Sequence, residues 1–238
     1  MITCGTQIVS GASGATTTVA AADITDASAS GISVLTGTAA DGRLALAPYT
    51  AEALTGTGWT YSTGLGGTAA VSGGSIALTT DVGPDSFGRA GLLGVGLLAF
   101  EVRARISVAT TMTTSAHILA VTLASALALT THVGVIVLGD GTAYAARDGG
   151  GTSGAAVTLA GVLGGQGWVR IVVRGGNCLA YVGVGSGGAP PADADWRGVG
   201  AVDRGADSAP WSGIVAQLYT TSGACAATLT SLSYRVIA

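Results

Sequence analysis

Strict alternation of apolar and polar residues is the feature of this sequence that most restricts its fold. In Phe100–Val108 every even position is apolar, and the odd positions are Glu, Arg, Arg and Ser. Successive side chains of a β-strand point to opposite faces, so this segment buries one face and leaves the other polar. Helix caps and the 3.6-residue apolar period of a helix are not evident anywhere in the sequence. The pattern therefore predicts an all-β protein.

Gly-rich turns separate the predicted strands. Gly175-Gly176-Asn177 lies between two alternating segments, 168–174 and 178–184, and Ser72-Gly73-Gly74 lies between residues 68–71 and 75–80. Such turns favour antiparallel hairpins. Thr221-Ser222-Gly223 joins the last two alternating segments of the chain. Strands that recur at intervals of about 8–12 residues are typical of an antiparallel sandwich or barrel.

A long uncharged segment tests this interpretation. Residues 106–139 contain no Asp, Glu, Lys or Arg. Residues 118–139 are apolar enough to resemble a transmembrane helix. However, the segment contains His132, and residues 133–138 are mostly β-branched and run into Gly139-Asp140-Gly141, a hairpin signal. We therefore expect two buried strands and no membrane span.

The composition excludes several classes of protein. Only 10 % of the residues are charged and none is Lys, whereas about 25 % are charged in an ordinary domain. A net charge of −3 with scattered Arg gives no basic surface for nucleic acid. A mean hydropathy of +0.58 excludes intrinsic disorder.

The N-terminal fifth of the chain differs from the rest. Residues 1–50 are rich in small residues with weak alternation, and they cannot bury much apolar surface alone. We expect an arm or small β extension at 1–50 that makes an assembly contact, and a β-sandwich at 51–238, with the boundary near Pro48-Tyr49-Thr50. The first residues have no basic and apolar leader pattern, so we expect no signal peptide.

The three cysteines, Cys4, Cys178 and Cys225, have no metal-ligand spacing. Cys178 and Cys225 both fall in strand-like segments, and a bridge between them is conceivable. We favour buried free thiols, because buried Cys behaves as a small hydrophobic residue.

The order of the segments resembles a known fold. Gly58-Trp59-Thr60, the segment 70–78, the strand 100–108, the hairpin 168–184 and the final strand 231–238 follow one another as in concanavalin A-like jelly rolls, including laminin G-like modules. The resemblance covers residues 55–238 and implies that the first and last strands pair within one sheet. It also implies a role among lectins, glycoside hydrolases or structural modules of virus particles. The Gly-, Ala-, Thr- and Ser-rich composition without Lys also resembles tailed-bacteriophage virion proteins.

Catalytic motifs are not evident. Jelly-roll glycosidases that resemble this fold carry a Glu-x-Asp-x-x-Glu motif, whose paired carboxylates divide the nucleophile and acid roles. This chain has only two Glu, Glu52 and Glu101, in different segments. We interpret His117 and His132 as structural, and Asp140 with Asp148 as turn residues rather than calcium ligands. We therefore predict no catalytic residue, no cofactor and no metal site.

The segment 192–211 is the most distinctive part of the chain, because it gathers acidic residues, Arg and two of the four Trp. A long connection whose Trp residues cap the core, a subunit interface and a glycan site all fit this composition. The candidate interface or glycan-contact residues are Asp193, Asp195, Trp196, Arg197 and Trp211.

We predict a non-enzymatic structural component of a virus particle, such as a phage head decoration, head fibre or tail protein. Its partners would be other virion subunits and copies of itself, with a trimer fitting such an appendage, and it would assemble in the host cytoplasm. The alternative is a carbohydrate-binding, lectin-like module for adhesion or receptor binding. A glycoside hydrolase is the least favoured function.

Overall fold

The computed structural model of this chain describes residues 37–38, 44–45, 49–93, 100–108, 112–124, 132–147, 151–158, 167–174, 177–203 and 213–236. Contacts divide the chain into two units, residues 1–49 with 235–238 and residues 50–234. In the first unit, β1 (Gly37–Thr38) pairs with β2 (Leu44–Ala45), and the Arg235 guanidinium carbon lies 4.4 Å from the Tyr49 ring centroid. The predicted assembly contact of residues 1–50 falls largely outside the described residues and stays a prediction.

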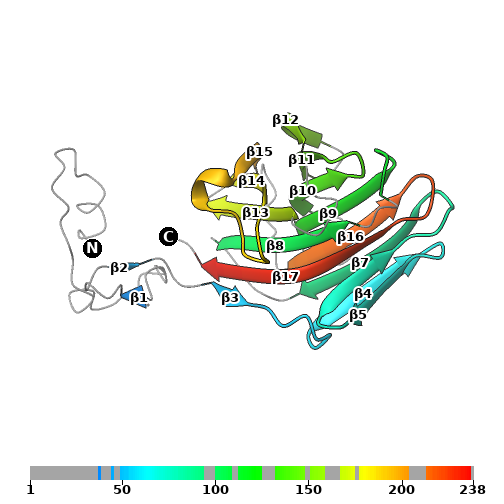
Figure 1. The fold of residues 1–238 in the computed structure, drawn as a ribbon, viewed down its shortest axis with the longest axis horizontal. Coiled ribbons are helices and arrows are strands. Elements are labelled where there is room, and N and C mark those ends of the chain that lie inside the picture. The colour runs from blue at the N-terminus through cyan, green and yellow to red at the C-terminus, as the bar shows by residue number, and fades with distance from the viewer. Residues whose placement is uncertain are drawn as a thin grey trace. The chain divides into compact units, whose positions relative to one another are not determined.

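Residues 50–234 form a sandwich of two antiparallel sheets (Figure 1). The seven-stranded sheet contains, in spatial order, β12 (Gly151–Thr158), β11 (Thr142–Arg147), β10 (His132–Leu138), β9 (His117–Ala124), β16 (Gly213–Thr220), β7 (Ser86–Leu93) and β4 (Trp59–Gly64). The eight-stranded sheet contains β15 (Arg197–Asp203), β14 (Asn177–Val184), β13 (Gly167–Arg174), β8 (Phe100–Val108), β17 (Ala226–Val236), β6 (Ser75–Thr79) and β5 (Thr68–Ser72), with β3 (Thr50–Ala51) also beside β17.

The apolar positions of the alternating strands form the core between the sheets. Val102, Ala104 and Ile106 of β8 are at most 1 % exposed, and they pack in one cluster with residues of the other sheet such as Leu123 and Ile214.

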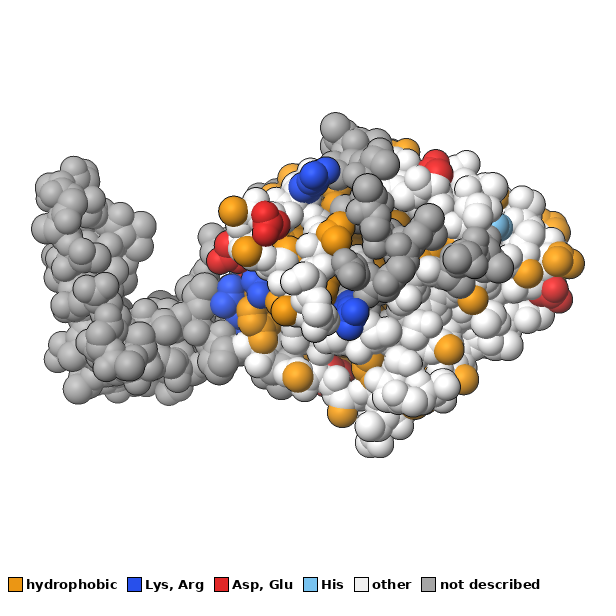
Figure 2. All heavy atoms as spheres, viewed as in Figure 1, with side chains coloured by type: hydrophobic (Ala, Val, Ile, Leu, Met, Phe, Trp, Pro, Cys, Tyr) orange, Lys and Arg blue, Asp and Glu red, His pale blue; other side chains and the backbone are white. Residues whose placement is uncertain are grey.

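Figure 2 shows few charged side chains on the viewed face. The prediction of an all-β antiparallel sandwich is confirmed.

The predicted hairpins are also confirmed. The pairs β5–β6, β10–β11 and β13–β14 are antiparallel neighbours. Gly73 and Gly74 have φ of +57° and +77°, which residues other than glycine rarely adopt. The uncharged segment forms the neighbouring strands β9 and β10, and the described ranges contain no helix with the length and hydropathy of a membrane crossing.

The pairing of first and last strands differs from what the resemblance implied, because β4, the first strand of residues 55–238, pairs with β7 in the seven-stranded sheet, whereas β17 lies in the other sheet. The short strand β3, which precedes these residues, does lie beside β17, with Ala51 opposite Ser233 and Thr50 opposite Tyr234. This pairing joins residues that are far apart in the sequence.

Cys178 and Cys225 are buried free thiols, as predicted. Burial raises the pKa of Cys178 from 9.0 to about 12. Burial also raises the pKa of Cys225, although its hydrogen bond with Thr80 acts in the opposite direction. The two thiols are therefore protonated and unreactive in the folded protein at neutral pH.

The raised pKa of Cys178 predicts a loss of stability at high pH. The unfolded thiol releases its proton near pH 9.0, whereas the folded thiol keeps it to about pH 12. The unfolded chain therefore binds fewer protons in this window, and the free energy of unfolding decreases as the pH rises through it. Urea unfolding between about pH 8 and about pH 11 measures this decrease. In Cys178→Ala the decrease should be smaller, and an equal decrease would contradict the assignment.

Candidate functional site

A groove of about 360 Å³ lies on the outer face of the seven-stranded sheet. Its floor follows from the strand register, which places Ala120 of β9 between Gln217 of β16 and Ile136 of β10. The methyl group of Ala120 is much shorter than its two neighbours. Ile118 and Thr122, which share the outer face with Ala120, also line the groove. The hollow therefore arises where one small residue is surrounded by larger ones.

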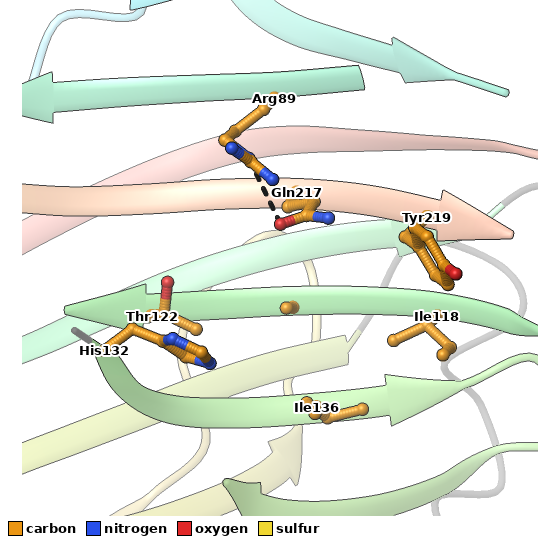
Figure 3. Close-up of a pocket in the computed structure, with 8 residues that line it drawn as sticks. Arg89, Ile118, Thr122, His132, Ile136, Gln217 and Tyr219 are labelled. Carbon is orange, nitrogen blue, oxygen red and sulfur yellow. Dashed lines mark hydrogen bonds between the residues drawn. The ribbon is translucent and has the colours of Figure 1, made fainter. Parts of the chain in front are cut away.

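A guanidinium–amide pair forms one long edge of the groove. Arg89 Nε donates a hydrogen bond of 3.2 Å to Gln217 Oε1, as Figure 3 shows. The Arg89 guanidinium carbon also lies 4.7 Å from the ring centroid of Phe87, two residues earlier on β7. These contacts fix the direction of the guanidinium. Burial lowers the pKa of Arg89 from its ordinary value, and the group remains charged at neutral pH.

Tyr219 lies at one end of the groove, beside Ile118 (Figure 3). Its hydroxyl donates a hydrogen bond to Asp85 Oδ1. This bond, followed by burial and the negative charge of Asp85, raises the pKa of Tyr219 above 10.0. The phenol is therefore neutral at physiological pH, and its half-buried ring offers an apolar surface beside a polar tip.

His132 and Thr122 lie at the opposite end of the groove (Figure 3). The Thr122 hydroxyl donates to the Val215 carbonyl oxygen at 3.3 Å. The groove thus combines an apolar floor with hydrogen-bonding groups at both ends and along one edge. Such a lining suits a ligand that has an apolar face and polar groups at its rim.

The described candidate residues of the segment 192–211, which are 193, 195, 196 and 197, lie at the other sheet. Asp193 and Asp195 are exposed in the short helix η3 (Asp193–Asp195), and exposed Arg197 begins β15. Trp196, in contrast, is only 9 % exposed. Trp211 lies outside the described residues. The described candidates are therefore neighbours in the chain, but they are remote from the groove.

Trp196 packs on the outer face of the eight-stranded sheet. The guanidinium carbons of Arg103 and Arg170 each lie 5.7 Å from the centroid of its ring. A buried ring that already contacts two cations does not present a face on which a sugar could stack. Trp196 therefore covers the side chains of Arg103 and Arg170 on the outer face and does not belong to the apolar cluster between the sheets.

Glu101 is buried beneath the same connection. It is 1 % exposed and forms ion pairs with Arg170 Nε and, at 3.3 Å, with Arg103 Nε. Arg103 also lies 3.6 Å from Asp193 Oδ1. Because Glu101 is on the sheet opposite the groove, the groove and this glutamate do not form one site.

The remaining candidate groups have structural partners. His117 Nδ1 accepts a hydrogen bond from the Thr113 amide at 3.2 Å, and His117 Nε2 lies 3.0 Å from the Ser222 carbonyl oxygen, so the ring is a satisfied structural histidine as expected. Asp140 accepts a bond from the Thr142 amide in the β10–β11 turn, whereas Asp148 lies outside the described residues. In the part of the chain that the structure describes, no three His, Cys, Asp or Glu side chains gather as metal ligands.

Comparison with solved structures supports the fold. The chain is similar to the VIP36 exoplasmic/lumenal domain in its Ca2+/Man-bound form, with a TM-score of 0.53, 11 % identity and coverage of 79 % of this chain and 89 % of that one. It is also similar to arcelin-5, a lectin-like defense protein from Phaseolus vulgaris, with a TM-score of 0.51, 12 % identity and coverage of 79 % and 98 %. A prokaryotic beta-1,3-1,4-glucanase (lichenase) derived from a mouse hindgut metagenome matches with a TM-score of 0.53, 11 % identity and coverage of 80 % and 100 %.

No family model and no curated protein matches the sequence. The similarity to these solved structures shows that the chain has a concanavalin A-like, legume lectin-like jelly-roll fold. At these identities they show the fold alone.

Proposed function

We propose that this chain is a carbohydrate-binding module whose ligand lies in the groove of the seven-stranded sheet. The observation that carries the proposal is the lining of that groove, which places the ring of Tyr219 and an apolar floor beside the fixed Arg89–Gln217 pair. A pyranose ring has the matching character, since its C–H face is apolar and its rim carries hydroxyl groups. Neighbours of this fold include a mannose-bound domain and a lectin-like protein, and these support the choice of ligand.

A binding role is favoured over hydrolysis. Retaining glycosidases need two carboxylates that flank the bond to be cleaved. The lining residues that the structure describes include no Asp or Glu, and Glu101 is buried on the other sheet with Arg103 and Arg170. A glucanase is among the structural neighbours. Each binding assay should therefore be accompanied by a measurement of polysaccharide hydrolysis.

The predicted role in a virus particle stays a prediction. It rested on the composition and on the arm-like residues 1–50, and neither the described contacts nor the structural neighbours support it. A carbohydrate-binding module would also fit an adhesive part of such a particle, so the proposal for the groove does not depend on where the protein resides.

The test is binding of the full chain to an array of oligosaccharides, followed by titration calorimetry with the best ligand. We expect Tyr219→Ala to raise the dissociation constant about tenfold or more, because the ring contributes a large rigid contact surface. Tyr219→Phe keeps the ring and should retain most of the affinity. Tyr61→Ala is the matched control. Tyr61 lies on the edge strand β4 and is 37 % exposed.

Two results would contradict the proposal. One is an array on which no oligosaccharide binds, and the other is a bound sugar whose affinity is equal in Tyr219→Ala and in the unchanged protein. If the protein hydrolysed the bound polysaccharide, we would conclude that it is an enzyme and not a binding module.

A further inference from the structure

The edge strands of the two sheets differ in how they are protected from pairing with another chain. Among the described strands, β12 and β4 border the seven-stranded sheet, and β15 and β5 border the eight-stranded sheet. The ladders of β12 and β15 each contain a register shift, and β15 begins with Arg197 and ends with Asp203. Bulges and charged side chains hinder the addition of a further strand. The ladders of β4 and β5 have no such shift, and the two strands contain no charged residue and no Pro.

β5 is the more accessible of these two unprotected edges, at the border of the sandwich in Figure 1. All its residues are exposed except Ala69, which is half-buried. β4, in contrast, begins with the buried Trp59, and its Ser62 and Gly64 are half-buried. β5 is therefore the edge that an additional strand can reach most easily.

The turn of the β5–β6 hairpin fixes which backbone groups of β5 face its neighbour. Only Gly73 and Gly74 lie between the paired residues Ser72 and Ser75. Both glycines have positive φ, as in a two-residue hairpin turn, where the residues that flank the turn form a hydrogen-bonded pair. Ser72 and Ser75 are therefore hydrogen-bonded to each other through their backbones.

The outward-facing groups of β5 follow from this starting point. Hydrogen-bonded and non-hydrogen-bonded pairs alternate along an antiparallel ladder. The N–H and C=O groups of Ala70 therefore point toward β6, whereas those of Ala69 and Val71 point away from it. β6 is the only strand paired with β5 in the described part of the chain. Ala69 and Val71 thus offer two donors and two acceptors along the edge.

Apolar surface lies beside these backbone groups. The side chains of Val71 on β5 and Tyr61 on β4 are each 37 % exposed. They lie near each other, because a Cβ built at Gly56 would be 3.3 Å from Val71 Cγ2 and 3.7 Å from the Tyr61 hydroxyl. A strand added to β5 would cover part of this apolar surface and also satisfy the backbone groups.

A second copy of β5 matches this edge. If it runs antiparallel about a twofold axis at Ala70, Ala69 lies opposite Val71 of the second copy, and Val71 lies opposite its Ala69. Each of these two pairs then exchanges two backbone hydrogen bonds. The two Ala70 side chains face each other, and their methyl groups are small enough for the strands to approach closely. The same surface is used by both copies, as in other twofold dimers.

We propose that this protein forms a dimer in which the β5 strands of two copies pair antiparallel and join the two eight-stranded sheets into one. The inference does not rest on the proposed carbohydrate-binding function, because the groove residues belong to the other sheet. The paired strands have only five residues each. The contact is therefore small, and we expect a dissociation constant of about 10–100 µM.

Sedimentation equilibrium of the full chain, from about 1 µM to about 1 mM, measures this association. We expect the mean mass to rise from that of a monomer toward that of a dimer across this range. Ala70→Lys should raise the dissociation constant about tenfold or more, because it places two like charges directly opposite each other. Ala194→Lys adds the same charge at an exposed position beside β15, at the opposite edge of the sheet, and is the matched control.

A mixture of two variants tests the register. Ala70→Glu alone should weaken the dimer as Ala70→Lys does, whereas an equal mixture of the two should associate about as tightly as the unchanged protein, since opposite charges then face each other. Val71→Pro removes one outward N–H and should also raise the dissociation constant about tenfold, because Pro is tolerated where an edge N–H faces solvent. Equal melting temperatures of the dilute variants would show that the fold is unchanged.

Three results would overturn the inference. The first is a protein that stays monomeric at every concentration. The second is a dimer whose dissociation constant is unchanged in Ala70→Lys, because the copies would then associate through another surface. The third is a mixture of the folded Lys and Glu variants that does not associate, because the twofold axis would then not lie at Ala70. The first measurement uses the unaltered protein, so it tests the dimer even if a variant fails to fold.

Discussion

Glu101→Ala is expected to lower the free energy of unfolding by about 3–5 kcal/mol. Glu101 is 1 % exposed and is the carboxylate between two half-buried guanidinium groups, those of Arg103 and Arg170. Removal of this carboxylate leaves both cations partly desolvated and facing each other across neighbouring strands, where they are paired in the register. The stabilisation lost is therefore larger than that of a surface salt bridge.

Urea unfolding of the variant and the unchanged protein measures this effect. Glu101→Gln keeps the shape and one hydrogen-bonding oxygen but removes the charge, so its loss of stability should be smaller than that of the Ala variant. Glu52, the only other glutamate, supplies the control, and Glu52→Ala should change the stability by about 0.5 kcal/mol. A loss below about 1 kcal/mol in Glu101→Ala would show that the cluster does not hold the connection on the sheet.

Gly88→Ala is expected to cost about 3 kcal/mol or to prevent folding. A Cβ at this position would lie 1.9 Å from the Thr68 carbonyl oxygen and 3.1 Å from that of Thr79. Both oxygens belong to backbone of the opposite sheet, at strands β5 and β6. Because backbone within a paired strand cannot move aside as a side chain can, the two sheets would have to separate at this edge.

Gly83→Ala is the matched control, since a Cβ at Gly83 meets no atom within 4 Å. Its stability should stay within about 0.5 kcal/mol of the unchanged protein. The thermal midpoint and the urea midpoint of both variants measure the difference. If Gly88→Ala were as stable as Gly83→Ala, the sheets would not approach as closely as the structure shows.

Local patterns predicted the strands and the turns of this protein. The alternation in Phe100–Val108 depends only on neighbouring residues, and it placed Val102, Ala104 and Ile106 in the core. The turn at Gly73 and Gly74 could also be predicted from the sequence, because its backbone conformation favours glycine. The buried thiols followed from Cys lying in apolar strands.

The groove could not be predicted in this way. Alternation places Ala120, Gln217 and Arg89 on polar or outer faces, but they become neighbours only through the pairings β9–β16 and β16–β7. The sequence drew attention instead to Trp196, because Trp beside acidic residues is typical of binding sites. Its burial against Arg103 and Arg170 depends on the path of the connection between β14 and β15, which no local pattern reveals.

The sequence by itself determined which segments are strands, which residues face the core and that the fold is an antiparallel sandwich. Strand periodicity and turn chemistry act over a few residues, so they are visible in the chain. Only the tertiary structure decided that β16 and β17, joined by the short turn at Thr221-Ser222-Gly223, belong to different sheets, and that Arg89 meets Gln217 across 128 positions of sequence. Those outcomes depend on pairing between distant strands, where the register and the packing of the two sheets select the neighbours.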